Sequence, residues 1–108
     1  MDSRARRLAQ AGREHGKLIL PLWKPAAIAD RKRITQYIAK DNPRAAIEIG
    51  DMLMQMAEKL DRHSTLGRVG RVNGTRELVV HPNYILIYRI VAEVPEVLRV
   101  KHVAQKWP

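Results

Sequence analysis

Three arginines and a histidine in the second half of the chain carry the side chains best suited to chemistry on an anion. Arg68, Arg71 and Arg76 lie close together around an Asn-Gly pair, and His81 follows them. A guanidinium group binds phosphate or carboxylate oxygens through two N–H donors at once. An imidazole titrates near neutral pH, so His81 suits acid or base catalysis. These residues predict a phosphate-binding site with a proton carrier, or simply a solvated basic hairpin followed by a solvated histidine.

The wider surroundings of these residues are also basic. From residue 68 to the end, the chain holds seven Lys or Arg residues and three glutamates, and the further cations are Arg89, Arg99, Lys101 and Lys106. The whole chain of 108 residues has a formal net charge of +9. Such a charge attracts a polyanion, which can be a nucleic acid, an acidic protein or an anionic membrane surface.

Several classes of protein are excluded by composition. The chain has no cysteine, so it has neither a disulfide framework nor a thiolate site. Its longest apolar run, residues 84–92, is about half as long as a membrane-spanning helix and contains Arg89. No apolar signal core follows the basic N-terminus, and His15 and His63 have no spacing for a metal site. We expect a cytoplasmic protein without a metal, a cofactor or a membrane contact.

The elements that position these side chains begin after a basic N-terminal arm. Residues 1–16 contain little apolar surface, and we expect them to be loosely ordered, either as a polyanion-binding tail or as an unimportant extension. Residues 17–108 then form a single domain. Residues 17–23 predict an edge strand because Pro21 lacks the N–H that a central strand needs.

Two helices should follow this strand. The first spans residues 25–40, with an apolar face of Ala27, Ile28, Ile34, Tyr37 and Ile38, while Asp30, Arg31, Lys32 and Arg33 lie mostly away from that face. The second begins at Asn42-Pro43, a typical helix start, and runs to about Leu60. The short connection predicts an antiparallel hairpin. Met52 should point outward from the second helix, as solvated surface or as part of a soft binding patch.

Short β-type runs and turn signals fill the rest of the chain. We expect a short segment over residues 68–72, an Asn-Gly turn, and strands over residues 75–81, 84–92 and 97–103, with a break at residues 93–96. Alternation in the last strand places Val97 on the face opposite Val100. The predicted fold class is α+β: an N-terminal edge strand, an antiparallel two-helix hairpin, and a three-stranded antiparallel sheet packed against the helices, with its second face free to bind.

The order of these motifs resembles the RelE/ParE superfamily of type II toxin–antitoxin toxins, and its ParE-like and StbE-like members in particular. The resemblance covers residues 17–108 and rests on YIA-DNP-AA (residues 37–46), GR-GRV (residues 67–72), GTRELVV (residues 74–80), YILIYR (residues 84–89), VLRV (residues 97–100) and the closing His102, Gln105 and Trp107-Pro108.

This resemblance implies a toxin, as in plasmid stabilisation, that a typically acidic antitoxin holds inactive in a hetero-oligomer. RelE-type members cut messenger RNA on the ribosome, whereas ParE-type members poison DNA gyrase. RNA cleavage needs a base, cations for the phosphate charge and an acid. Candidates for these roles are Arg68, Arg71, Arg76, His81 and Lys106. The chain departs from the ribonuclease pattern, however, because it has Val80-His81-Pro82 where the RNA-cutting members commonly carry an arginine, and Lys106-Trp107 where they often carry an Arg/Tyr or His/Tyr pair.

Gyrase poisoning is therefore the preferred prediction. A RelE-type endoribonuclease is the alternative, and a non-toxic basic nucleic-acid-binding module is a third possibility. Residues predicted to contact the target or the antitoxin are Arg76, Arg89, Arg99, Lys101, Trp107 and Met52. His102 shares a strand face with Leu98 and Val100, so it is predicted to be a half-buried structural histidine rather than a base. Tyr84 and Tyr88 are predicted to pack in the core.

Overall fold

A computed structural model describes residues 21–105 and residue 107. Its elements, in chain order, are β1 (Leu22–Trp23), α2 (Pro25–Ala39), α3 (Pro43–Glu58), the 3-10 helix η1 (Lys59–Asp61), β2 (Arg68–Val69), β3 (Arg76–His81), β4 (Tyr84–Val91) and β5 (Val94–His102). The predicted arm, the first part of the predicted edge strand, and Lys106 lie outside the described residues.

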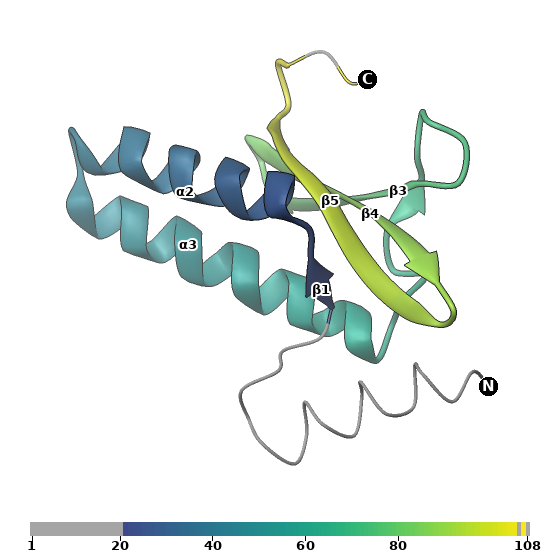
Figure 1. Ribbon diagram of the computed structural model, residues 1–108. Helices are drawn as coiled ribbons and strands as arrows, with labels where there is room; N and C mark the ends of the chain where they lie inside the picture. Colours follow the sequence, from purple (N-terminus) through teal and green to yellow (C-terminus); the bar gives the residue numbers. More distant parts are fainter. Residues whose placement is uncertain (1–20, 106, 108) are drawn as a thin grey trace.

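The fold has two layers, an α-helical hairpin and a five-stranded sheet (Figure 1). The strand order is β1-β5-β4-β3-β2, so the two shortest strands form the edges. The β2–β3, β3–β4 and β4–β5 pairs are antiparallel, while β1 runs parallel to β5 through the pairs Leu22–Glu96 and Trp23–Val97. The predicted α+β class, helix hairpin and three-stranded antiparallel sheet are confirmed.

The second helix begins and packs as predicted. The Asn42 side chain accepts a hydrogen bond from the Ala45 backbone N–H (3.1 Å), and Pro43 occupies the first turn, where a missing N–H costs nothing. Its apolar stripe enters a core that also takes in the central strands. The buried cluster consists of Ala27, Leu53, Ala57, Leu60, Leu78, Val80, Leu86, Tyr88, Val97 and Val100.

The predicted face of the first helix is partly wrong. Ile28 and Tyr37 are 43% and 71% exposed, whereas Asp30 is only 2% exposed. Ala27, Asp30 and Ile34 lie three and four residues apart, so they share one side of a helix. That side is turned toward the sheet because the Asp30 carboxylate has partners on β5. A specific polar contact, rather than the largest apolar area, sets the rotation of α2.

The predicted alternation in the last strand is also wrong. Both Val97 and Val100 are buried in the core. The register explains this, because Ile87 pairs with Arg99 and Tyr88 pairs with Val97, which leaves Leu98 as an extra residue in β5. Such a β-bulge shifts the alternation by one position. The bulge therefore brings two valines three residues apart onto the same face.

Two turns differ from the sequence prediction. Residues 93–96 do not break the sheet, since β4 and β5 are joined directly by Ala92 and Glu93, with φ of 50° and 68°. Two positive φ angles match the tight hairpin turn that suits twisted strands, but glycine and asparagine normally adopt them. In the other turn, β2 ends at Val69 instead of continuing to Val72, and Gly74 adopts φ of +83°.

The Ala92-Glu93 turn should therefore be improvable. We expect the pair Ala92→Asn and Glu93→Gly to raise the free energy of unfolding by about 1 kcal/mol, because non-glycine residues at positive φ are strained. The measurement is the urea midpoint. Ala104→Gly serves as the control, since Ala104 is exposed but has no positive φ and its replacement should not stabilise the fold. An unchanged or lower midpoint for the double variant would contradict this assignment of strain.

Candidate functional site

Three carboxylates, of which Glu77 and Asp30 are buried, bind several of the cations that the sequence analysis predicted to bind an anion. Glu77, in β3, is 2% exposed and accepts hydrogen bonds from the Arg68 guanidinium (3.1 Å) and from the Arg71 backbone N–H (3.0 Å). The Arg71 Nε also lies 4.0 Å from this carboxylate. At the far end of the β4–β5 hairpin, Glu96 contacts Arg89 Nη2 (3.1 Å) and Lys24 Nζ (3.9 Å).

Asp30 forms the third cluster, between α2 and β5. Its two carboxylate oxygens accept hydrogen bonds from Arg99 Nε (2.7 Å) and Nη2 (3.0 Å) and from the Val100 backbone N–H (2.9 Å). Arg33, one helical turn away, donates to it as well (3.2 Å). The strand β1 pairs with β5 only at Glu96 and Val97, so Asp30 satisfies a strand N–H that β1 does not reach.

These three clusters share one design. Each places two cations on one carboxylate, so each keeps a net charge of about +1. The carboxylates are the hidden partners and the cations are the more exposed ones, as the side chains of Arg68 and Glu77 illustrate (59% against 1% exposed). The predicted anion-binding surface is therefore divided into three separate positively charged clusters. In each cluster, the carboxylate orients the side chains of its cationic partners.

The two most buried carboxylates remain ionised well into the acid range. Burial opposes ionisation of Asp30, but the hydrogen bonds from Arg99 and Val100 and the nearby positive charges outweigh it and lower the Asp30 pKa. Glu77 behaves in the same way: burial raises its pKa, and the Arg71 N–H and the Arg68 guanidinium lower it by more. The hydrogen bond to Asp30 in turn raises the pKa of Arg99.

Arg76 has a different environment from the other two arginines of its group. Its Nη1 donates to the Gly67 carbonyl (2.8 Å), in the loop before β2. The same loop is held by the buried Tyr88 hydroxyl, which donates to the Ser64 carbonyl (2.6 Å) and accepts from the Gly67 N–H (2.9 Å). Arg76 pairs with Tyr88 on the helix-facing side of the sheet, whereas Arg68 pairs with Glu77 on the other side. The three arginines are therefore not brought to one site.

His81 lies at the opposite end of β3 from Arg76, about 17 Å away at the ordinary rise of a strand. Its ring centroid is 5.8 Å from that of Tyr84, and the Tyr84 ring meets the His102 ring edge to face at 5.4 Å. Each histidine accepts a hydrogen bond at Nδ1 from a backbone N–H two residues on, Asn83 for His81 and Ala104 for His102, both at 3.0 Å. A neutral imidazole bonded in this way carries its proton on Nε2.

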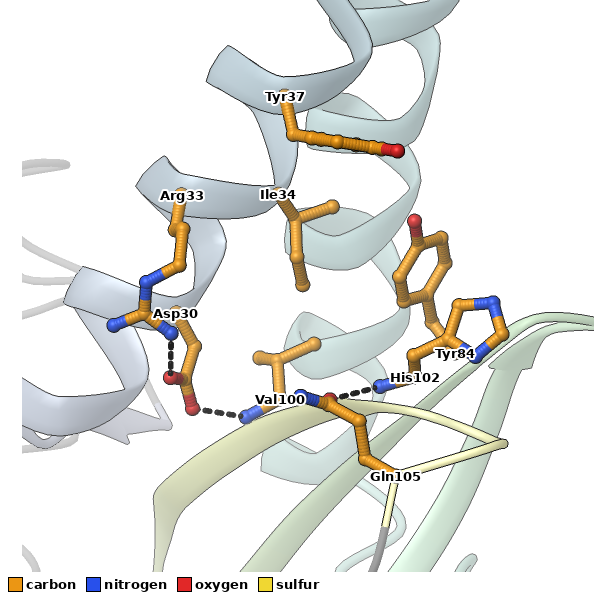
Figure 2. Close-up of a pocket in the computed structure, with 8 residues that line it drawn as sticks. All are labelled: Asp30, Arg33, Ile34, Tyr37, Tyr84, Val100, His102 and Gln105. Carbon is orange, nitrogen blue, oxygen red and sulfur yellow. Dashed lines mark hydrogen bonds and ion pairs between the residues drawn. The ribbon is translucent and has the colours of Figure 1, made fainter.

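A pocket of about 280 Å³ opens beside this aromatic group, between α2 and the end of β5 (Figure 2). We call it the α2–β5 pocket. Ile34, from α2, and Val100, from β5, contribute apolar lining, and Tyr37, Tyr84 and His102 lie around the same space. Its lining residues are Asp30, Arg33, Ile34, Tyr37, Tyr84, Val100, His102 and Gln105.

The other residues predicted to contact the target or the antitoxin do not line this pocket. Lys101 pairs with Ile85 on the sheet face turned away from the helices. Met52 is 36% exposed on α3. Trp107 is half-buried, and its indole Nε1 is buried without a hydrogen-bond partner among residues 21–105 and 107. Within the same residues, no helix is long and apolar enough to cross a membrane.

Sequence reasoning missed the residues that build the α2–β5 pocket from the helix side. Tyr37 was assigned to the core and Arg33 to a solvated face, yet both line the pocket. Asp30 offered a usable signal, since an acidic residue spaced with Ala27 and Ile34 within a basic segment is expected to need a cationic partner. Nothing local could identify that partner as Arg99, which is 69 residues away.

Comparison with known proteins decides the family. Residues 22–107 match the model of the ParE toxin of the type II toxin–antitoxin system parDE. The chain belongs to the ParE toxin family. Within the RelE/ParE superfamily, it is therefore a toxin of the type II toxin–antitoxin class, as the motif order indicated.

Several relatives agree with this placement. The ParE-family chain is 38% identical over 87 residues to the protein Y4kP of Sinorhizobium fredii, which covers 80% of this chain and 90% of the relative. It is 31% identical to toxin RelE2 of Caulobacter vibrioides over 78% of this chain and 94% of that toxin. A solved structure of the chromosomal ParDE system from P. aeruginosa has the same fold, with a TM-score of 0.70 at 20% identity over 79% of this chain and 96% of that one.

The Asp30 cluster yields a prediction about stability. Asp30→Asn should lower the free energy of unfolding by about 3 kcal/mol, because the amide keeps only one acceptor oxygen, loses the negative charge that faces Arg99, and puts an NH2 group where Asp30 has its second oxygen. Urea unfolding at neutral pH measures this loss. Asp41→Asn is a suitable control, since Asp41 is an exposed aspartate in the connection between the helices.

The same cluster predicts a pH dependence. Because the folded-state pKa of Asp30 is lowered, its contribution is present above the unfolded pKa of about 4 and is lost as the pH falls through the folded value. Stability should therefore fall steeply from about pH 4 downward, and less steeply in Asp30→Asn. Parallel pH profiles for the two proteins would contradict this role for Asp30.

Proposed function

We propose that this toxin inhibits growth by poisoning DNA gyrase, and that a cognate acidic antitoxin, encoded beside it, neutralises it. The match of residues 22–107 to the ParE family carries this proposal. In this scheme the protein acts in the cytoplasm, where gyrase works, and in plasmid stabilisation modules. It requires no catalytic group, because a poison acts by binding its target.

The arrangement of the arginines supports a binding role over catalysis. RNA cleavage needs cations, a base and an acid around one phosphodiester. Here Arg68 and Arg71 are tied to Glu77, while Arg76 holds a loop on the opposite face of the sheet. Paired, preoriented guanidinium groups that keep a net positive charge are well suited to an acidic protein surface.

One observation favours the endoribonuclease alternative. His81 and His102 lie on either side of Tyr84, and each has its proton directed to Nε2 by a backbone hydrogen bond. A pair of fixed imidazoles of this kind suits general acid–base chemistry. If the protein cuts RNA, this end of the sheet is the stronger candidate, and Arg76 belongs to the framework instead.

The two functions predict different damage in cells. Induction of the toxin without its neighbouring reading frame should stop growth, with gyrase cleavage complexes accumulating and messenger RNA ends unchanged. Co-induction of the neighbour should restore growth. Quantitative trapping of gyrase–DNA complexes and genome-wide mapping of RNA 5′ ends provide the measurements. Rapid cleavage of ribosome-bound messages, without gyrase complexes, would overturn gyrase poisoning.

Substitution of His81 separates the two functions further. We expect His81→Ala to leave toxicity largely intact if gyrase is the target, because no imidazole chemistry is required. A ribonuclease that uses His81 should lose about 100-fold or more in activity. Arg76→Ala is the comparison variant, and it should lower stability through the released loop whichever function holds. Loss of toxicity in His81→Ala at normal protein levels and stability would favour the ribonuclease.

A further inference from the structure

Three of the residues that line the α2–β5 pocket offer hydrogen-bond donors, and the Tyr37 and Tyr84 hydroxyls can donate or accept. Gln105 Oε1 accepts from the His102 N–H (2.8 Å), so the amide nitrogen with its two N–H groups remains available. His102 Nδ1 accepts from the Ala104 N–H, so its Nε2 is a donor too. Arg33 adds a guanidinium whose side chain is 69% exposed. The acceptor oxygens of Asp30 are already occupied by Arg99, Val100 and Arg33.

The walls around these donors are apolar or aromatic. Tyr37 is 71% exposed, and in Figure 2 its ring is seen edge-on with one face toward the space above Ile34. Tyr84 and His102 close the other side, and their edge-to-face contact leaves no parallel slot between them. Such a site offers apolar contact below and donors at its rim, so it suits an apolar group with an anionic neighbour.

The size of the pocket limits its occupant. A volume of about 280 Å³ lies at the lower limit of the range of about 300–1,000 Å³ typical of small-molecule sites. One large side chain fits it better than a nucleotide with base, sugar and phosphate. The net charge of +9 also disfavours a second copy of this chain and favours an acidic partner.

We propose that the α2–β5 pocket seats one apolar or aromatic side chain of an acidic protein segment, whose neighbouring carboxylates bind the donors around it, Arg33 on one side and His102 and Gln105 on the other. The inference rests on the proposed function, because the antitoxin is the acidic partner it assumes. The side chain contacts Ile34 and Val100 and packs against the Tyr37 ring. Carboxylates on either side of that side chain accept from the Arg33 guanidinium and from the Gln105 amide or the His102 Nε2–H.

Gln105→Glu tests the donor rim with little change in shape. A glutamate oxygen still accepts from the His102 N–H, but the second oxygen replaces two donors with a negative charge. Its matched control is Gln55→Glu, which makes the same charge change on an exposed position of α3. Tyr37→Ala removes the aromatic wall, and Ile47→Ala is its control, since Ile47 is an exposed apolar residue of α3 outside the pocket.

The probe is the purified protein encoded by the reading frame adjacent to the toxin gene, titrated calorimetrically into each full-length variant. We expect Gln105→Glu and Tyr37→Ala each to weaken binding by about tenfold or more, the scale of a central interface side chain. Both controls should remain within about threefold of the wild type. Thermal unfolding of each free variant establishes that it is folded.

Two outcomes would overturn the proposal in different ways. If the wild type binds the partner and the pocket variants bind equally well, the pocket is not its seat, although neutralisation by this partner still holds. If the wild type forms no complex, the proposed function fails as well. A parallel titration with single-stranded oligouridine tests whether the pocket binds a nucleic acid instead. If the pocket variants lose RNA binding but keep partner binding, the pocket is a nucleic-acid site and the proposal is wrong.

Discussion

The attachment of α2 to β5 through Asp30 is the constraint on which the rest of the fold depends. One carboxylate joins a helix near the start of the domain to a strand near its end, through a guanidinium and a backbone N–H. Because the N–H of Val100 has a fixed position in the strand, the contact sets both the rotation of α2 about its axis and the position of α2 along β5. The exposure of Tyr37 and the burial of Ala27 follow from that rotation.

Other charged groups of the molecule are arranged as Asp30 is, with one carboxylate between two cations. A chain with 20 basic and 11 acidic residues has an excess of cations, so a carboxylate shared by two of them is an efficient arrangement. Burial of the carboxylate and exposure of the cations keep the ion pairs structured while the net charge remains at the surface. Affinity for a polyanion then depends on a few oriented guanidinium groups, rather than on a diffuse positive face.

The sequence predicted most of the helices and strands, but it did not predict which side chains of each element face the core. The Asn42-Pro43 start and the β-type residues near the C-terminus are local signals: the first located the start of α3, and the second located most of β5, which begins at Val94 instead of at the predicted residue 97. The bulge at Leu98 and the contact of Asp30 with Arg99 depend on residues far apart in the chain, so no local periodicity contains them. The candidate arginines were divided between the two sheet faces for the same reason, since strand register decides which side each one takes.

The α2–β5 pocket can be understood as a consequence of how the sheet edge is protected. Strand β1 covers only two residues of β5, and the exposed strand edge beyond it would invite pairing with another chain. Asp30 and Gln105 occupy the Val100 and His102 N–H groups there, so that edge is closed to a strand. Both capping side chains also line the pocket. A partner at this edge therefore meets side-chain donors and an apolar hollow in place of backbone groups, which favours recognition through inserted side chains over addition of a β-strand.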